Sequence, residues 1–123
     1  ARYGGGVSVS ADSMDTIINR VHVLDSGANW GGAMALLADS QYRYTTVQSS
    51  KFEGCTAMQG GGLYIMGAGN GVNIEFCEVL NNKAEGALLS DGGGIWVMNA
   101  YTHIMASSIG SNSASDNGGG INF

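Results

Sequence analysis

Cysteine and histidine side chains are the most direct candidates for nucleophilic or metal chemistry in this sequence. Cys55 and Cys77 form no CxxC pair, and His22 and His103 lie far from both thiols along the chain. A structural zinc site needs four such ligands at short spacings, and a cysteine nucleophile needs a histidine that can take its proton. We therefore expect no metal site, no cofactor and no catalytic thiol.

Carboxylates are the next candidates, because polysaccharide lyases and hydrolases gather several of them, with Arg or Lys, on one face. Aspartate is common in turns, where its side chain bonds to the local backbone. The aspartates here stand in stretches typical of turns and do not recur at one interval, so the sequence predicts a protein that is not an enzyme. They are Asp12, Asp15, Asp25, Asp39, Asp91 and Asp116.

The composition argues against two kinds of partner. The net charge is −5, from ten acidic residues against five Lys and Arg, which leaves no basic stripe for a phosphate backbone. No apolar run approaches the roughly 20 residues of a membrane-spanning helix, and the N-terminus lacks the charged and apolar segments of a signal peptide. We expect no nucleic acid, no membrane insertion and no signal peptide.

Glycine clusters recur along the chain and reveal the elements that position these side chains. The clusters lie at 4–6, 31–32, 60–62, 92–94 and 118–120. Taking Gly6, Ala33, Gly62, Gly94 and Gly120 as equivalent gives periods of 27, 29, 32 and 26 residues. A short alternating apolar segment follows each cluster, which is typical of a strand with one inward face.

A second pattern fills the rest of each repeat and starts at Thr16, Thr45, Val72 and Thr102. In the last repeat it reads Thr102-x-Ile104-x-x-Ser107-x-Ile109-x-x-Asn112-x-Ala114. Each step of three residues reverses the alternation, so the chain must bend there and one repeat holds about three short strands. Such a repeat cannot bury its apolar face alone, so successive repeats must stack as parallel sheets.

The predicted fold is therefore an all-β parallel β-helix, or β-solenoid, of about four coils of 26–32 residues. Residues 1–123 form one domain, possibly a segment of a longer repeat array. The glycine clusters should occupy tight bends that need positive φ or close backbone approach.

One inward column of the repeat is polar and contains Ser26, Cys55, Asn82 and Asn112. We expect these side chains to form a structural ladder that bonds to backbone groups at a bend. Cys77 falls in a different column, too far from Cys55 for a disulfide, so the two thiols should not be bonded to each other.

One outward column contains two aromatic residues, Tyr64 and Trp96, on adjacent coils. We expect their rings to stack and face outward, as a candidate contact surface for a sugar or a partner protein. A packing ladder covered by a loop or a neighbouring chain explains the pattern equally well.

Two repeats carry a motif with a known likeness: Val79-x-x-Asn82-x-Ala84 before Gly92-Gly93-Gly94-Ile95, and Ile109-x-x-Asn112-x-Ala114 before Gly118-Gly119-Gly120-Ile121. The motif resembles the repeats of polymorphic outer membrane proteins and related surface adhesins of the pectin-lyase-like superfold. The resemblance implies a right-handed β-helix and an extracellular or cell-surface location.

The expected function is that of a non-catalytic structural or interaction β-solenoid in a secreted or cell-surface assembly, as a fibre subunit or adhesin-like stalk segment. The alternative is a carbohydrate-binding or carbohydrate-processing β-helix. Residues 1–6 match residues 57–62, and the last residues also lie inside the repeat. Because uncapped coils expose edge strands, we expect head-to-tail self-association through open terminal coils.

Overall fold

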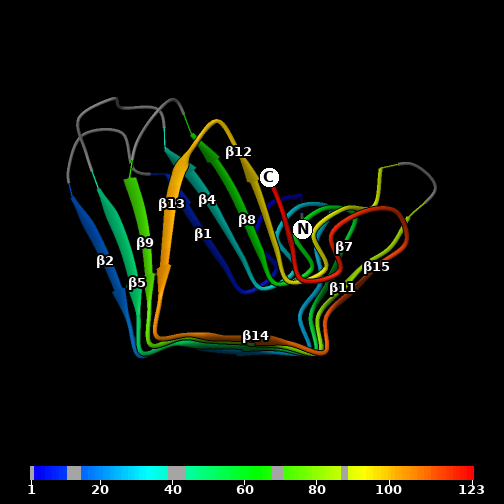
Figure 1. The fold of residues 1–123 in the computed structure, drawn as a ribbon, viewed down its shortest axis with the longest axis horizontal. Coiled ribbons are helices and arrows are strands. Elements are labelled where there is room, and N and C mark those ends of the chain that lie inside the picture. The colour runs from blue at the N-terminus through cyan, green and yellow to red at the C-terminus, as the bar shows by residue number, and fades with distance from the viewer. Residues whose placement is uncertain (1, 11–14, 39–43, 68–70, 87–88) are drawn as a thin grey trace.

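The structure, a computed structural model, describes residues 2–10, 15–38, 44–67, 71–86 and 89–123. Within these ranges it contains sixteen β-strands and no helix. All pairings between the strands are parallel, and the strands of successive coils stack into four sheets (Figure 1). The predicted parallel β-solenoid is therefore confirmed.

The four sheets are numbered here in the order in which the chain enters them. Sheet 1 contains β1 (Val7–Ser10), β4 (Met34–Ala38), β8 (Leu63–Gly67), β12 (Ile95–Met98) and β16 (Ile121–Asn122). Sheet 2 contains β2 (Thr16–Asn19), β5 (Thr45–Gln48), β9 (Gly71–Glu75) and β13 (Tyr101–Met105). Sheet 3 contains β3 (His22–Leu24), β6 (Lys51–Glu53), β10 (Glu78–Leu80) and β14 (Ser108–Gly110). Sheet 4 contains β7 (Thr56–Ala57), β11 (Lys83–Ala84) and β15 (Ser113–Ala114).

The stack makes about three turns, fewer than the four that the repeat predicted. Only three coils contribute a strand to sheet 4. In the first coil the corresponding chain makes just an isolated bridge, between Gly27 and Thr56. The repeat pattern in the sequence therefore predicted one more complete coil than the structure contains, because the first coil lacks a strand in sheet 4.

The register between coils follows the columns read from the sequence. In sheet 1, Met34 pairs with Leu63, and Leu63 pairs with Ile95. In sheet 2, Val47 pairs with Ile74. Residues from these inner columns form a continuous buried core between sheets 1, 2 and 3, with sheet 3 along the base of the view in Figure 1.

The corners are built from residues with positive φ, which turn the chain sharply between sheets. Arg20, Ser49, Phe76 and Ala106 adopt this conformation between sheets 2 and 3. Asp25, Gly54, Asn81 and Ser111 adopt it between sheets 3 and 4. The first glycine of every cluster does so before sheet 1. The predicted bends and the predicted role of the glycine clusters are thereby confirmed.

The second glycine of the first four clusters serves a different purpose, which is close contact between two backbones. A Cβ atom at Gly61 would lie 2.4 Å from the Gly93 carbonyl oxygen and 2.5 Å from the Lys83 carbonyl oxygen. Contacts under about 3 Å are not available to a methyl group. Glycine therefore allows the chain to return against sheet 4 before it enters sheet 1.

Candidate functional site

The asparagine column forms a ladder of hydrogen bonds that joins one coil to the next. Asn82 is 1% exposed, and its Nδ2 donates to the Phe52 carbonyl at 3.0 Å. Its Oδ1 accepts from the Cys55 N–H at 2.9 Å. Asn112 repeats both bonds one coil later, with the Val79 carbonyl at 2.8 Å and the Asn82 N–H at 2.8 Å. Each amide side chain therefore satisfies a donor and an acceptor of the preceding coil, as expected.

Ser26 and Cys55 occupy the same column in the first two coils and bond only weakly. The Ser26 hydroxyl donates to the Leu24 carbonyl at 3.4 Å. The Cys55 thiol donates to the Glu53 carbonyl at 3.3 Å. Both of these bonds stay within one coil. The Cys55 thiol also contacts the Val23 carbonyl of the preceding coil, at 3.9 Å. These two residues therefore belong to the ladder by position but connect coils more weakly than asparagine does.

The residue that packs beside the ladder explains part of this variation. A Cβ atom at Gly62 would lie 2.6 Å from the Gly94 carbonyl oxygen and 3.0 Å from Asn82 Nδ2, so glycine as the third residue of the cluster leaves room for the next coil and for the asparagine. In the preceding coil the equivalent position is Ala33, which is completely buried, and the ladder residue is the smaller Cys55. Of these two coils, the one with the larger cluster residue has the smaller ladder residue.

A second ladder lies at the bend between sheets 2 and 3 and was not predicted. Ser50 Oγ accepts from the Val21 N–H at 3.1 Å and donates to the Gln48 carbonyl at 2.8 Å. Ser107 Oγ accepts from the Cys77 N–H at 3.0 Å two coils further on. Serine spaced five residues before the asparagine column is the sequence signal that marks this ladder.

Both cysteines are free thiols at ladder positions, Cys55 in the first ladder and Cys77 in the second. Burial raises the pKa of both thiols above the usual value for cysteine. A raised pKa reduces the thiolate fraction and therefore the nucleophilicity of the side chain. His22 and His103 instead lie on the exposed outer faces of sheets 3 and 2.

The outward aromatic column contains a stacked pair, as predicted. The ring centroids of Tyr64 and Trp96 are 4.7 Å apart, and the planes differ by 6°. Tyr64 is only 5% exposed, whereas Trp96 is partly exposed. Burial raises the pKa of the Tyr64 hydroxyl. That this pair forms a contact surface for a sugar or a partner protein stays a prediction.

Tyr3 and Trp30 extend the stacked pair into a cluster of four rings, and sequence reasoning missed both. Their own rings stack at 4.9 Å, and they lie 6.2 Å and 6.4 Å from the Tyr64 ring. The Arg2 guanidinium lies 5.7 Å from the Tyr3 ring and 5.4 Å from the Trp30 ring. Tyr64 is therefore enclosed by three other rings, which restricts access to its faces.

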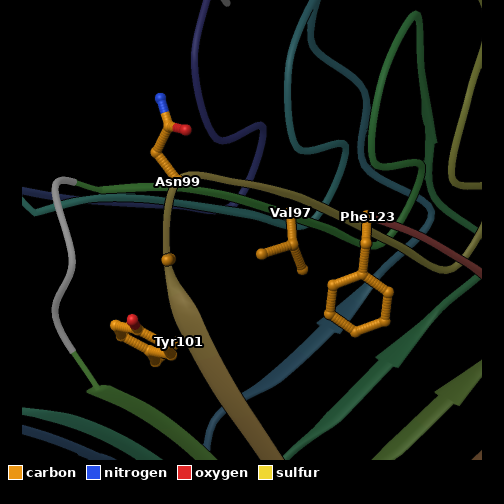
Figure 2. A pocket seen from close by; sticks show the side chains of 5 residues that line it. Val97, Asn99, Tyr101 and Phe123 are labelled. Atoms are coloured by element: carbon orange, nitrogen blue, oxygen red, sulfur yellow. The ribbon is translucent and has the colours of Figure 1, made fainter.

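A cavity of about 430 Å³ lies beside the last coil. It is lined by Val97, Asn99, Ala100, Tyr101 and Phe123. Figure 2 shows the side chains of Val97 and Phe123 pointing to the same side, while the Asn99 side chain points away from them. Phe123 is 77% exposed although it follows β16 in the inner column of sheet 1. This apolar cavity was not predicted.

Three of the aspartates that the structure describes, Asp15, Asp91 and Asp116, accept hydrogen bonds from backbone N–H groups. Asp15 accepts from the Tyr44 N–H at 3.0 Å, and Asp116 accepts from the Ser90 N–H at 3.1 Å. Asp12 and Asp39 lie outside the described residues. In the described ranges, no three His, Cys, Asp or Glu side chains come together as a group able to hold a metal ion.

A small charged network lies on the outer face of sheet 3. Lys51 Nζ is 2.9 Å from Glu53 Oε2 and 3.8 Å from Glu78 Oε2. Its bond to Glu53 raises the pKa of Lys51 and lowers the pKa of Glu53. Exposed pairs of this kind add little to stability, so the network affects the surface charge more than the fold.

No protein-family model, curated protein or solved structure matches this chain. The described residues also include no helix with the length and apolar character that a membrane span requires.

Proposed function

We propose that this chain is a non-catalytic structural β-solenoid, a fibre subunit or stalk segment of a secreted or cell-surface assembly. The observation that carries the proposal is that inward polar side chains form hydrogen bonds between coils. Asn82, Asn112, Ser50 and Ser107 all bond backbone groups of a neighbouring coil. The polar groups inside the solenoid thus stabilise the stack, and this favours a mechanical role over a chemical one.

The proposed setting follows from the resemblance of the repeats to polymorphic outer membrane proteins and related surface adhesins. We propose on this basis a right-handed β-helix of the pectin-lyase-like kind, located outside the cell or on its surface. The Asn ladder and the glycine contacts supply a physical reason for the two motifs that carry the resemblance. Detection of the chain on intact cells with an antibody tests the location, and signal only after lysis contradicts it.

The proposed partner is a second copy of the chain, bound head to tail. On the last coil, β13, β14, β15 and β16 each pair with a single strand in the described structure. The inner side chains of that coil, among them Ile104, Ile109 and Ile121, are only partly buried. Edge strands above a partly open apolar core favour pairing with a further coil. Sedimentation equilibrium of the purified chain tests the self-association. The expected result is an average mass that rises with protein concentration, and a constant monomer mass would contradict the proposal.

Carbohydrate binding is the second candidate, because two tyrosine side chains are exposed on sheet 2 and one of them, Tyr101, lines the cavity. Tyr101 is 76% exposed and Tyr44 is 61% exposed, and both lie at the start of sheet 2 strands or directly before them. Exposed aromatic faces bind sugar rings. NMR titration with oligosaccharides would show shifts that Tyr101→Ala or Trp96→Ala abolishes, whereas unchanged spectra throughout would exclude this candidate.

A further inference from the structure

The outer face of sheet 2 carries a column of aromatic side chains, in which one tyrosine ring lies over a glycine. The register of the sheet places Tyr44, Gly71 and Tyr101 one after another along the stack. A Cβ atom at Gly71 would lie 2.4 Å from Cδ1 and 2.5 Å from Cε1 of Tyr44. The glycine therefore makes room for the Tyr44 ring, which leans toward β9 and is still 61% exposed. Both β5 and β9 have a neighbouring strand on each side, so the exposure of Tyr44 does not come from an open edge of the sheet.

A polar column runs beside the aromatic column, two residues further along each strand. It contains Thr46, Asn73 and His103, which alternate with more deeply buried residues and therefore point outward. Within the described ranges, none of these three side chains forms a hydrogen bond or an ion pair. On sheet 3, by contrast, the outward Lys51 bonds Glu53. Sheet 2 therefore keeps its outward donors and acceptors available to a ligand.

The spacing of the two columns matches the dimensions of an extended sugar chain. Successive members of a column lie about 4.8 Å apart, and the two columns lie about 6.6 Å apart along the strands. A β-1,4-linked glycan is a flat ribbon in which each pyranose unit advances by slightly more than one coil spacing. The faces of its rings carry C–H groups, which bind aromatic rings, and its edges carry hydroxyl groups. A glycan that lies along the stack therefore brings one sugar unit to each coil, with C–H groups at the tyrosines and hydroxyls at the polar column.

Charge favours a neutral glycan on this face. Among the described residues, β2, β5, β9 and β13 contain no lysine or arginine. Carboxylates stand at Asp15, which bonds the Tyr44 N–H, and at Glu75. A polymer of uronic acids would bring like charges close to both carboxylates, and no basic side chain of these strands would compensate them. A neutral glycan meets no such repulsion.

We propose that the outer face of sheet 2 binds a neutral β-1,4-linked glycan that lies along the stack. Tyr44 and Tyr101 contact the C–H faces of its sugars, and Asn73 and His103 bond its hydroxyl groups. Sheets 1 and 3 lie on the other side of sheet 2, across the core, so neither covers this face (Figure 1). The inference rests on the carbohydrate-binding candidate above and specifies the site and the class of ligand.

NMR titration of the full chain tests the site, with cellohexaose and chitohexaose as neutral probes and hexagalacturonic acid as the acidic one. The neutral probes should shift backbone amides of β5, β9 and β13, and the acidic probe should leave them unchanged. Equal or stronger shifts with the acid would overturn the assignment to neutral glycans. Shifts centred on Trp96 in sheet 1 would overturn this site and leave carbohydrate binding intact. No shift with either neutral probe would overturn the inference, and a shift with some other oligosaccharide would then leave the wider candidate standing.

Substitutions on the face provide a second test. Tyr44→Ala and Asn73→Ala each remove one contact with the glycan and should weaken the binding of cellohexaose several-fold. Phe76→Ala is the matched control, because Phe76 is 60% exposed, close to the value for Tyr44, but lies at the corner between sheets 2 and 3. An affinity that falls as far in the control, or that falls in neither of the two variants, would overturn the site.

Gly71→Ala tests the arrangement of the aromatic column without removing a ring. Gly71 is not among the glycines with positive φ, so alanine is compatible with its backbone, and the new Cβ would displace the Tyr44 ring from its place beside β9. The melting temperature should stay within a few degrees of its original value, whereas the affinity for cellohexaose should fall several-fold. An unchanged affinity would overturn the role assigned to the leaning ring.

Discussion

Replacement of Asn82 by alanine would remove the central rung of the asparagine ladder. The side chain is 1% exposed and bonds the Phe52 carbonyl at 3.0 Å and the Cys55 N–H at 2.9 Å. Without it, a buried acceptor and a buried donor lose their partners. Each orphaned group costs about 1–3 kcal/mol, so we expect a loss of about 2–6 kcal/mol in the free energy of unfolding. A domain of this size has about 5–15 kcal/mol in total.

The assay is urea denaturation followed by circular dichroism and tryptophan fluorescence, with the free energy of unfolding taken from linear extrapolation. Asn112→Ala is the matched control, because Asn112 makes equivalent bonds in the last coil but is partly exposed. Because Asn112 is itself partly exposed, the space that this control leaves opens to solvent, and water that enters it can replace part of the lost bonding, so its loss should be clearly smaller. Equal losses, or a loss at Asn82 below about 1 kcal/mol, would refute the assignment of the ladder as a stabilising device.

Three further predictions concern the core, the glycine contacts and the thiols. Ile74→Asp should unfold the chain because it buries an unpaired charge. The control Asn73→Asp, on the outer face, should leave the melting temperature of the chain within a few degrees of its original value. An unchanged melting temperature for Ile74→Asp would contradict the register. Gly61→Ala should lower the free energy of unfolding by about 1–3 kcal/mol, as overpacking changes do, since its Cβ would lie 2.4 Å from a carbonyl oxygen. A neutral effect in denaturation would contradict the backbone contact. Cys55 and Cys77 should resist alkylation in the native chain and react fully in urea, because both are buried and their pKa values are raised; mass spectrometry showing a bond between them would contradict their separate columns.

The elements that recur in every coil could be predicted from the sequence. The inner columns containing Val47 and Ile74, and the ladder containing Asn82, appear several times at nearly the same spacing. Repetition makes such a pattern visible, and the strict alternation of strand side chains fixes which residues face inward.

Features that occur once, or that depend on contacts across the coil, could not be predicted. The column that contains Tyr3 and Trp30 continues as Gln59, so it offers no repeated aromatic signal. The outward direction of Tyr64 followed from alternation, but its burial also depends on the Tyr3 and Trp30 rings, which come from two other segments and add to the stacked Trp96 ring. The cavity beside Val97 depends on how Phe123 is placed, which no spacing in the sequence specifies.

Electron microscopy and fibre diffraction of the 123-residue chain at high concentration test the central claim most directly. The claim is that this solenoid extends by end-to-end addition of copies. It predicts filaments whose strands lie across the long axis, with a reflection near 4.8 Å along that axis. Uniform particles of monomer mass at the highest concentration reached, with no such reflection, would contradict it.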